Sequence, residues 1–536
     1  MEQRAWYRRR STIVACALSL VAGAVVGGIY LTGSDPDPQP PLSASAPTTA
    51  PDTPATAPDA PVARICGNRA VLDGPAEPPS GAVTVSTSQN LNDVTEAHPA
   101  GTTFWLARGV HKLGTGEFSQ VIPKAGNTYV GAPGAVLDGR RLNRYAFTGD
   151  APGVTVKNLT VQNFGPPRSG SDEGVVNHDS ASAWVVESNT IWKNAGAGVM
   201  LGSRNVVRNN CLMQNGQYGF NAYHPDNVDE ITVEHNEITA NNTDDWEKLR
   251  PGCGCSGGGK FWMVDGAVVR NNWVHHNKAA GMWADTNNLG FAIVGNYISD
   301  NDAEGIVYET SYNALIRGNA FVRNGWKKGP TNAGFPTSAI YISESGSDPR
   351  VAGKYNKTFE ISDNVFTDNW SGVILWENAD RFSGSSANTS TDASTLVNPS
   401  VVTGKTCNEQ NIKSEKDPFV DDCRWKTQNV QVHDNVFSLD PEKIGTTCAS
   451  KKGCGYNGLF SNWGTFPDWA EPYHRQAIQD SITFKQDNRF YGNTYSGPWH
   501  FVVHSQGTTA NWATWQGAPY GQDRDSVVKV ATPGER

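Results

Sequence analysis

Two stretches of this chain repeat almost the same pattern: NWVHHNKAAGMWADTNN at residues 272–288 and NYISDNDAEGIVYETSYN at residues 296–313. In each stretch the first Asn is followed two positions later by an aliphatic residue, five positions later by a second Asn and nine positions later by a Gly. An acid stands thirteen positions after the first Asn, Asp285 in one stretch and Glu309 in the other. A carboxylate therefore returns at the same place in a repeating unit.

The Asn–aliphatic–Asn–Gly pattern extends over the middle of the chain. Where no insertion intervenes, its glycines are 21 or 24 residues apart, and short alternating runs such as GVML, FAIVGN and GIVYE lie between them. Alternation with a period of two is typical of half-buried strands. Complete copies begin at Asn189, Asn210, Asn272 and Asn296, and partial copies begin at Asn236, Asn319, Asn364 and Asn435.

Three short strands in roughly 22 residues predict one coil of a parallel β-solenoid, because a single coil is unstable alone and stacked coils share a continuous core. The backbone of each coil would pair with the next at about 4.8 Å. We expect Asn at the corners, because it tolerates left-handed backbone and its stacked amides can bond one another in a ladder. The predicted fold class is all-β.

From Ala82 to about Asp525 the chain resembles the right-handed parallel β-helix proteins of the pectin-lyase-like superfamily. Besides the repeat, SQNLNDVTEAHPAGTTFWLARGVHKL at residues 88–113 resembles their capping helix and first coil, and YVGAPGAVLDGRR at residues 129–141 resembles the second coil. The resemblance implies a helix near residues 90–97 that covers the open end of the core. That superfamily consists mostly of extracellular polysaccharide lyases, hydrolases and epimerases, with some adhesins, so the fold alone leaves the activity open.

The N-terminal region is organised differently from the repeats. MEQRAWYRRR carries four Arg, and residues 11–31 are an uncharged apolar run. We interpret residues 1–33 as a signal peptide or a membrane anchor, which would place the rest outside the cell, secreted or anchored. Residues 34–62, rich in Pro, Ala and Thr, predict a disordered linker. Residues 63–536 would form one β-helix domain, with long insertions near 242–259, 380–426 and 440–486.

Composition narrows the choice of partners. A net charge of −9 gives no support to nucleic-acid binding. Eight Cys follow the apolar segment, an even number that favours disulfides, with Cys407–Cys423 and Cys448–Cys454 as local pairs. The Cys253-Gly-Cys255 spacing resembles a metal knuckle, but it lacks a second pair, so we predict no metal site. We expect a monomer.

Aligning the coils on their Gly predicts which side chains share a line up one sheet. The alignment uses Gly174, Gly198, Gly219, Gly281, Gly305 and Gly372, with Lys260 and Ala339 standing in for Gly. Four or five positions later, five consecutive coils carry an acid: Asp265, Asp285, Glu309, Glu344 and Glu377. Carboxylates about 4.8 Å apart repel one another, so a stacked row favours a functional reading over an incidental one.

Aromatic and basic residues accompany this line. We expect saccharide contacts from Trp262, Trp283, Tyr341 and Trp376, which stand on the same outward face, and from Asp265 in the acid line. His178 and His224 lie further along the predicted groove and are candidates for orienting substrate. Arg381 begins an insertion directly after the line and is a candidate subsite residue.

The spacing of the acids favours glycoside hydrolysis. Asp285 and Glu309 on neighbouring coils would stand about 5 Å apart, close to the separation in retaining glycosidases, whereas Asp285 and Glu344 would be nearer the inverting range. We predict Glu309 as acid/base and Asp285 as nucleophile or water-activating base, with Glu344 and Glu377 as helpers. No cofactor is expected.

Two alternatives stay open. A lyase or epimerase acting on uronic-acid glycans would need a base, for which Arg317, Lys278 and Arg381 are candidates, and calcium is possible in that case. The Asn-Thr-Asp and Asp-Pro-His-Glu strings of polygalacturonases and alginate epimerases are absent, so their catalytic residues cannot be carried over. The second alternative is a non-catalytic cell-surface protein that binds glycans.

Overall fold

A long solenoid of stacked coils makes up most of this protein. The computed structural model describes residues 57–166, 174–224, 226–251, 253–332, 335–348, 358–378, 403, 406, 425–450, 453–462, 480–504 and 508–529. The segment 1–33, most of the predicted linker, most of insertion 380–426 with Arg381, and the Cys407–Cys423 pair lie outside the described residues. Among the described residues, every helix is too short or too polar to span a bilayer.

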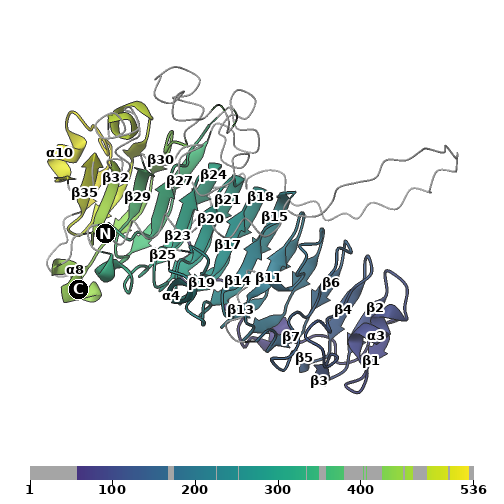
Figure 1. Ribbon diagram of the computed structural model, residues 1–536. Coiled ribbons are helices and arrows are strands. Elements are labelled where there is room, and N and C mark those ends of the chain that lie inside the picture. The colour runs from purple at the N-terminus through teal and green to yellow at the C-terminus, as the bar shows by residue number, and fades with distance from the viewer. Residues whose placement is uncertain are drawn as a thin grey trace.

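Three sheets form the walls of the solenoid, with 13, 13 and 11 strands, and the strands of each sheet come from successive coils (Figure 1). Sheet A contains β1 (Val83–Val85), β2 (Thr103–Leu106), β4 (Thr128–Gly131), β6 (Thr155–Lys157), β9 (Val185–Glu187), β12 (Val206–Arg208), β15 (Val228–Glu234), β18 (Val264–Arg270), β21 (Leu289–Val294), β24 (Tyr312–Arg317), β27 (Phe359–Ser362), β30 (Gln431–His433) and β33 (Arg489–Tyr491).

Sheet B follows sheet A around each coil. It contains β3 (Gly109–Lys112), β5 (Ala135–Asp138), β7 (Thr160–Gln162), β10 (Thr190–Trp192), β13 (Cys211–Met213), β16 (Glu237–Thr239), β19 (Trp273–His275), β22 (Tyr297–Ser299), β25 (Ala320–Val322), β28 (Val365–Thr367), β31 (Val436–Ser438), β34 (Thr494–Ser496) and β37 (Val527–Lys529).

Sheet C follows sheet B and completes each coil. It contains β8 (Gly174–Val176), β11 (Ala197–Leu201), β14 (Tyr218–Ala222), β17 (Gly259–Trp262), β20 (Met282–Asp285), β23 (Ile306–Glu309), β26 (Ile340–Ser343), β29 (Val373–Asn378), β32 (Tyr456–Asn462), β35 (His500–His504) and β36 (Thr509–Ala510). Its pairings are parallel except for β35 with β36. The predicted all-β parallel β-helix is confirmed.

Helices close both ends of the core. At one end α3 (Leu91–Glu96) begins at Asn90, whose side chain accepts from the Asn92 N–H, and it inserts Leu91 into the core. At the other end α10 (Trp512–Gln516) buries Trp515, which donates to the buried carboxylate of Asp523 (2.7 Å). Figure 1 shows α3 and α10 at opposite ends. The predicted capping helix is present.

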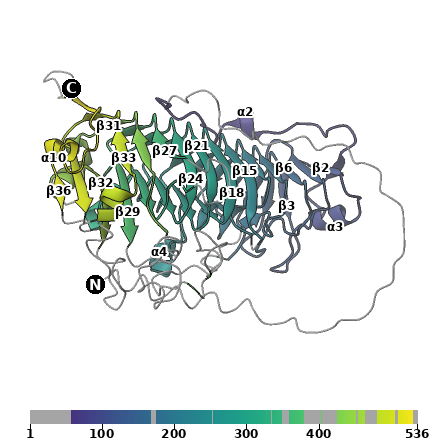
Figure 2. The same ribbon diagram turned by 90° about the horizontal axis from the view of Figure 1, so that it is seen from above.

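The remaining described helices lie before the first coil or in the connections between strands. These are α2 (Arg69–Leu72), α4 (Trp246–Leu249), η3 (Gly329–Thr331), α7 (Pro441–Ile444), α8 (Thr446–Ser450) and the single π turn η5 (Ser481–Lys485). Figure 2 shows α2 and α4 on opposite sides of the coil.

Two ladders of buried Asn side chains hold the corners around sheet B. In each ladder, the amide oxygen of one Asn accepts from the backbone and side-chain N–H of the Asn one coil earlier, as Asn296 does from Asn272 (3.0 and 2.9 Å). The ladder was predicted, but the prediction that its Asn residues have left-handed backbone is wrong. The left-handed residue is the one that precedes each Asn: Asn271 and His276, with φ of 55° and 53°, precede Asn272 and Asn277. The ladders join Asn189, Asn210, Asn236, Asn272, Asn296, Asn319, Asn364, Asn435 and Asn493, and Asn194, Asn215, Asn241, Asn277, Asn301, Asn324 and Asn369.

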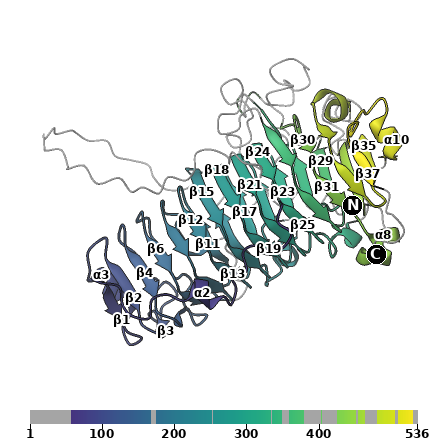
Figure 3. The same ribbon diagram turned by 180° about the vertical axis from the view of Figure 1, so that it is seen from behind.

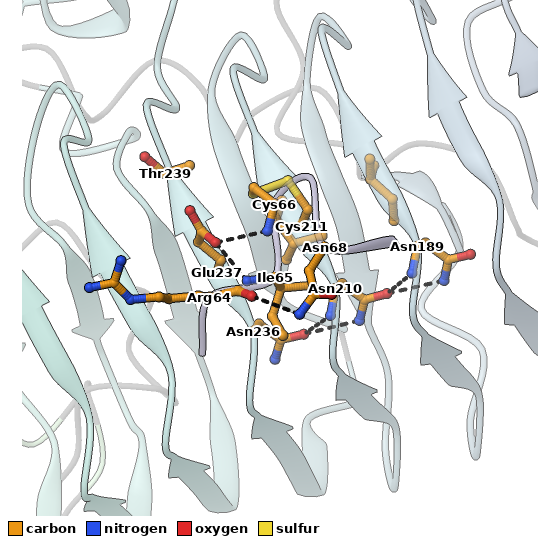
Figure 4. Close-up of a disulfide and its surroundings, with 12 residues drawn as sticks. Arg64, Ile65, Cys66, Asn68, Asn189, Asn210, Cys211, Asn236, Glu237 and Thr239 are labelled. Atoms are coloured by element: carbon orange, nitrogen blue, oxygen red, sulfur yellow. Dashed lines mark hydrogen bonds between the residues drawn. A yellow bond between two sulfur atoms is a disulfide. The ribbon is translucent and has the colours of Figure 1, made fainter. Parts of the chain in front are cut away.

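The segment before the first coil is fastened to the outside of sheet B. Cys66 forms a disulfide with Cys211, 145 residues away, and the Glu237 carboxylate accepts from the backbone N–H of Ile65 and Cys66 (both 2.8 Å), as Figure 4 shows. Figure 3 shows α2, next along the chain, lying near β13. The chain therefore joins the solenoid at the middle of one wall.

Removing this disulfide by Cys66→Ser with Cys211→Ser is expected to lower the free energy of unfolding by up to about 5 kcal/mol, because the crosslink closes a long loop in the unfolded chain. The pair Cys448–Cys454, predicted from sequence and present, spans only 6 residues, so Cys448→Ser with Cys454→Ser is the matched control and should cost about half as much or less. Urea unfolding measures both. Equal losses would contradict a loop-closure effect.

Candidate functional site on the outer face of sheet C

The long insertions leave the coil at the two edges of sheet C. Segments 240–258, 323–339 and 439–455 connect sheet B to sheet C, and segments 344–358, 379–430 and 463–488 connect sheet C to sheet A. Both edges of sheet C, where its strands begin and where they end, are therefore connected to long insertions. Binding residues commonly lie in such a position, on a rigid sheet beside loops.

The strand register brings the two central acids together. Met282, Trp283 and Ala284 pair with Ile306, Val307 and Tyr308, so the next residues, Asp285 and Glu309, are neighbours on adjacent strands. Met282 and Ala284 belong to the core, whereas Trp283 and Asp285 alternate with them and face outward. Adjacent strands lie about 4.8 Å apart. The predicted vertical pair is therefore present, and each of its residues is 3% exposed.

The register also corrects two steps of the alignment. Lys260 pairs with Trp283 and Trp262 pairs with Asp285, so Gly258, and not Lys260, holds the Gly position of that coil. Asp265 consequently lies in β18 of sheet A, away from the acid line. Gly174 pairs with Ala197 and is one residue out of step with Gly198. The alignment was wrong at this coil because insertion 242–259 interrupts the repeat, so the spacing no longer indicates where the next strand of sheet C begins.

Lys260 and Asp285 form a buried ion pair. The Lys260 Nζ lies 3.0 Å from Asp285 Oδ2, with side-chain exposures of 9% and 4%. It also donates to the Gly254 carbonyl (2.6 Å) and lies 5.5 and 4.9 Å from the ring centres of Trp262 and Trp283. Asp285 Oδ1 accepts from the Thr286 hydroxyl (2.9 Å). An opposite charge at this distance favours the ionised carboxylate.

The carbonyl that holds Lys260 comes from a covalently closed turn. Cys253 and Cys255 are disulfide-bonded, and Gly254 between them has a φ of 56°. The Cys-Gly-Cys spacing, which resembled a metal knuckle, therefore closes a tight loop above the ion pair. Among the described residues, no cluster of three or more His, Cys, Asp or Glu is placed to bind a metal ion.

Glu309 is held by the neighbouring aromatic residue. The Trp283 indole N–H donates to Glu309 Oε2 (2.8 Å). Trp283 is half-buried, with its ring between the Lys260 ammonium and the Glu309 carboxylate. The indole fixes the Glu309 side chain on the outer face while leaving part of its own ring surface open.

Glu304 is a further acid at this face, and sequence reasoning missed it. It lies in the turn immediately before the Gly that opens β23, at the sheet B edge of the strand that ends in Glu309. Burial raises the pKa of the Glu304 carboxyl to about 7, the nearby Lys328 lowers it, and the negative charge of Glu309 raises it. The residue keeps partial contact with solvent. The sequence did contain a signal for Glu304: it stands directly before the repeat Gly, at the position where other coils have Ala197, Tyr218 and Ala280.

Glu344 and Glu377 do not lie on the outer face with Asp285 and Glu309. They follow the outward residues Ser343 and Trp376 by one position, and both are 0% exposed. Glu377 Oε2 accepts from the Thr427 N–H (3.0 Å) and the Gln486 side chain (2.7 Å), while Ser343 donates to Glu344. Their alternation at the corner turns them inward, so the structure does not bring them into the predicted catalytic row.

The aromatic residues divide into two groups. Trp262 and Trp283 are half-buried beside the ion pair. Trp376 is buried by Phe335 (5.6 Å between ring centres) and Tyr341 (6.0 Å) in an apolar cluster over the outer face of the next strands. Tyr341 stays half-buried at the edge of this cluster, next to Val307 in the register. Trp376 therefore presents little surface to a ligand.

The predicted histidines lie away from the acid pair. His178 follows β8 and stacks on Tyr145 (3.8 Å between ring centres), and His224 follows β14 near Asp226 (3.9 Å). Both belong to earlier coils than Asp285. Arg317, considered as a base, pairs with Glu360 on sheet A, and Lys278 is exposed in a turn.

Replacing Lys260 with Met is expected to lower the free energy of unfolding at pH 7 by about 3 kcal/mol, because the change leaves a buried carboxylate without its charge partner. The matched control is Lys193→Met, since Lys193 is exposed and also lies over a Trp ring, 4.0 Å from the centre of Trp192. Its expected loss is below about 1 kcal/mol. Urea denaturation compares the two, and similar losses would argue against a buried pair.

Comparison with known proteins agrees with this architecture. The model of the right handed beta helix region matches residues 143–255 and 175–355. The protein is a right-handed parallel β-helix. The resemblance to that fold seen in the sequence is thereby confirmed. No curated protein matches the β-helix by sequence.

Solved structures with similar coils include three carbohydrate-related proteins. A structure of XylC with xylose has 10% identity, a TM-score of 0.47, and coverage of 83% of this chain and 85% of its own. The catalytic unit of an α-1,3-glucanase from Streptomyces thermodiastaticus has 15% identity, a TM-score of 0.46, and coverage of 81% and 66%. The A-module of mannuronan C-5 epimerase AlgE4 from Azotobacter vinelandii has 12% identity, a TM-score of 0.37, and coverage of 68% and 93%. Similarity at this level does not bear on the function.

Proposed function

We propose that this β-helix is an extracellular glycoside hydrolase that cleaves a polysaccharide lying along the outer face of sheet C. The observation that carries the proposal is the pair Asp285 and Glu309, side by side on adjacent strands and next to the half-buried Trp283. Retaining glycosidases use two carboxyl groups about 5 Å apart, one as nucleophile and the other as acid/base.

The surroundings support different roles for the two acids. Asp285, paired with the Lys260 ammonium and bonded by Thr286, is suited to remain an anion and to serve as nucleophile or stabilising charge. Glu309, whose Oε2 accepts from the Trp283 indole N–H, is placed to exchange a proton with a bound glycan as acid/base. The open ring surfaces of Trp262 and Trp283 suit stacking against sugar rings.

A second candidate is a lyase or epimerase acting on uronic-acid glycans. Lys260 favours it, because an ammonium on this face could meet a uronate carboxylate. The fact that the Lys260 ammonium already contacts Asp285 and Gly254 weighs against it, since a catalytic base must be free to accept a proton. A glycan-binding protein without activity is the third candidate.

A single screen separates these candidates. Purified protein is incubated with neutral and uronic-acid polysaccharides, and four signals are followed: new reducing ends, the ultraviolet absorbance of unsaturated products, the proton magnetic resonance spectrum of the polymer, and binding of the polymer. Hydrolysis gives reducing ends without absorbance, elimination gives both, and epimerisation changes the proton spectrum of an uncut polymer. Binding without any of these changes would overturn the proposal in favour of the third candidate.

A further inference from the structure

One disulfide of this chain closes too short a loop to contribute much to global stability. Cys253 and Cys255 are 2 positions apart in the sequence, whereas Cys66 and Cys211 are 145 positions apart. A disulfide stabilises a fold mainly by restricting the unfolded chain, and the gain grows with the length of the loop that it closes. The main effect of the Cys253–Cys255 bond must therefore lie in the local geometry that it fixes.

The loop that this disulfide closes is anchored on two sides. Gln217, buried at the corner before β14, donates its side-chain amide to the Cys255 carbonyl (2.8 Å). The buried Ser256 hydroxyl donates to the Glu247 carboxylate of α4 (3.1 Å), and Trp246 of the same helix is buried. The loop is thus tied to sheet C on one side and to a packed helix on the other.

The carbonyl of the residue between the two cysteines points at the Lys260 ammonium. The Gly254 carbonyl accepts from Lys260 Nζ at 2.6 Å, and both residues are buried. Gly254 has a φ of 56°, in the left-handed region that a residue with a branched Cβ rarely adopts. Because the disulfide closes a small ring around Gly254, its carbonyl is a fixed acceptor.

Lys260 needs a fixed acceptor because its side chain is flexible. A Lys ammonium is a point charge at the end of a four-carbon stem, with three rotatable donors. It lies 3.0 Å from Asp285 Oδ2 and donates to the Gly254 carbonyl. The rings of Trp262 and Trp283, whose centres are 5.5 and 4.9 Å from Nζ, flank it. Two acceptors and two rings together hold the charge in one place.

The position of this charge decides how the two acids of the site differ. An ammonium favours the ionised form of the carboxyl that it contacts, which suits Asp285 as an anion. Beside Glu309 the same charge would disfavour the protonated acid that must donate to the leaving oxygen. The Trp283 ring lies between Lys260 and Glu309, and its N–H donates to Glu309 Oε2 (2.8 Å). The site therefore requires the ammonium to stay on one side.

We propose that the Cys253–Cys255 disulfide is a positioning element of this face. By fixing the Gly254 carbonyl, it holds the Lys260 ammonium against Asp285 and away from the second acid. This deepens the proposed hydrolysis and rests on it. The disulfide acts on a bound glycan only through Lys260 and Asp285, so opening the loop would let the ammonium leave the carboxylate that it keeps ionised.

The first test is the rate at which acetic anhydride, in trace amount, acetylates the Lys260 amine, read by mass spectrometry. In the wild type, burial and two acceptors protect this amine. In Cys253→Ser with Cys255→Ser, we expect acetylation of Lys260 to become about tenfold faster relative to the exposed Lys193, because the flexible stem is released. An unchanged ratio would overturn the proposal.

A second pair of variants keeps both cysteines and decides the question if the double Ser variant does not fold. Gly254→Val places a branched Cβ in left-handed backbone, so the carbonyl must turn, whereas Asn tolerates that backbone and Gly254→Asn is the matched control. Gly254→Val should speed the acetylation of Lys260, and Gly254→Asn should not. The same rate in both variants would show that this carbonyl does not hold Lys260.

The other short disulfide provides a control for general loosening of the fold. Cys448 and Cys454 are 6 positions apart and lie in the segment that connects β31 to β32. Cys448→Ser with Cys454→Ser should leave the acetylation of Lys260 unchanged. An equal rise in this variant would assign the effect to loosening and overturn the proposal.

Turnover tests the consequence for the reaction. Cys253→Ser with Cys255→Ser should lower kcat by about 10- to 100-fold while KM changes less than about threefold, because misplaced groups affect the transition state more than binding. When it is combined with Lys260→Met, the same change should lower kcat no further, since the loop acts through Lys260. Losses that multiply would overturn the proposal.

The acetylation experiment does not depend on the proposed reaction. Faster acetylation of Lys260 in the open-loop variant of a protein without hydrolase activity would keep the loop as the anchor of Lys260 and remove only the proposed hydrolysis. A Lys260 that stays protected when the loop is opened in an active enzyme would remove this inference and keep the hydrolysis.

Discussion

Asp285→Asn and Glu309→Gln are each expected to lower kcat by about 10³-fold or more while binding of an oligosaccharide changes only a few-fold. The physical reason is that an amide keeps the shape of the carboxyl but can act neither as an anion at the anomeric carbon nor as a proton donor. In Glu309→Gln the amide oxygen can still accept the Trp283 indole N–H, so the local geometry is retained. Initial rates and calorimetric titration measure the two effects.

The control for this experiment is Glu187→Gln. Glu187 lies on the outer face of sheet A, where it pairs with Arg208 at 3.0 Å, and its loss should leave kcat unchanged. Thermal unfolding of all variants checks that the fold is kept, and Glu309→Gln serves alone if Asp285→Asn unfolds because Lys260 loses its partner. Retention of more than about a tenth of the activity in Glu309→Gln would remove Glu309 from the reaction.

Asn272→Ala is expected to lower the free energy of unfolding by about 3–5 kcal/mol. Asn272 is 0% exposed, and its side chain accepts from the Asn236 backbone and side-chain N–H (2.9 and 3.0 Å) and donates to the Val233 carbonyl (2.9 Å). Each buried polar group left without a partner costs about 1–3 kcal/mol. Urea unfolding, with hydrogen exchange at Asn236, measures the loss.

The neighbouring Asn271 provides a matched control for the ladder. It has the left-handed backbone of the corner, with φ of 55°, and its side chain contacts His235 at the exposed surface. Asn271→Gly removes the side chain and keeps the allowed backbone, so we expect a change within about 1 kcal/mol. A comparable loss in both variants would show that the corner backbone, and not the buried ladder, stabilises the stack.

The coil was predictable because its signals are local. The Asn–aliphatic–Asn–Gly spacing reports strand alternation and corner chemistry within about 22 residues, and the same spacing recurs often enough to exclude isolated turns. The pair Asp285 and Glu309 was predictable for the same reason. Their coils follow one another without an insertion, so residues at the same distance from the repeat Gly occupy the same position on adjacent strands. Where the chain inserts residues, at 242–259, this inference placed Lys260 and Asp265 wrongly.

Other features of the site depend on contacts between coils. Glu344 and Glu377 lie one residue past an outward position: Glu344 stands at the corner with φ of 43°, Glu377 is still within β29, and both are fully buried. The Lys260–Asp285 ion pair joins residues whose register an insertion hides, and Trp376 is covered by Phe335 from a separate loop. Glu304 stands in a turn, where its burial depends on the neighbouring coils. Periodicity in a chain determines which residues stack. Tertiary packing determines the rest. Which way a corner side chain points, which charge it pairs with and which residues bury it all depend on residues distant along the chain, and these come together only when the coils pack.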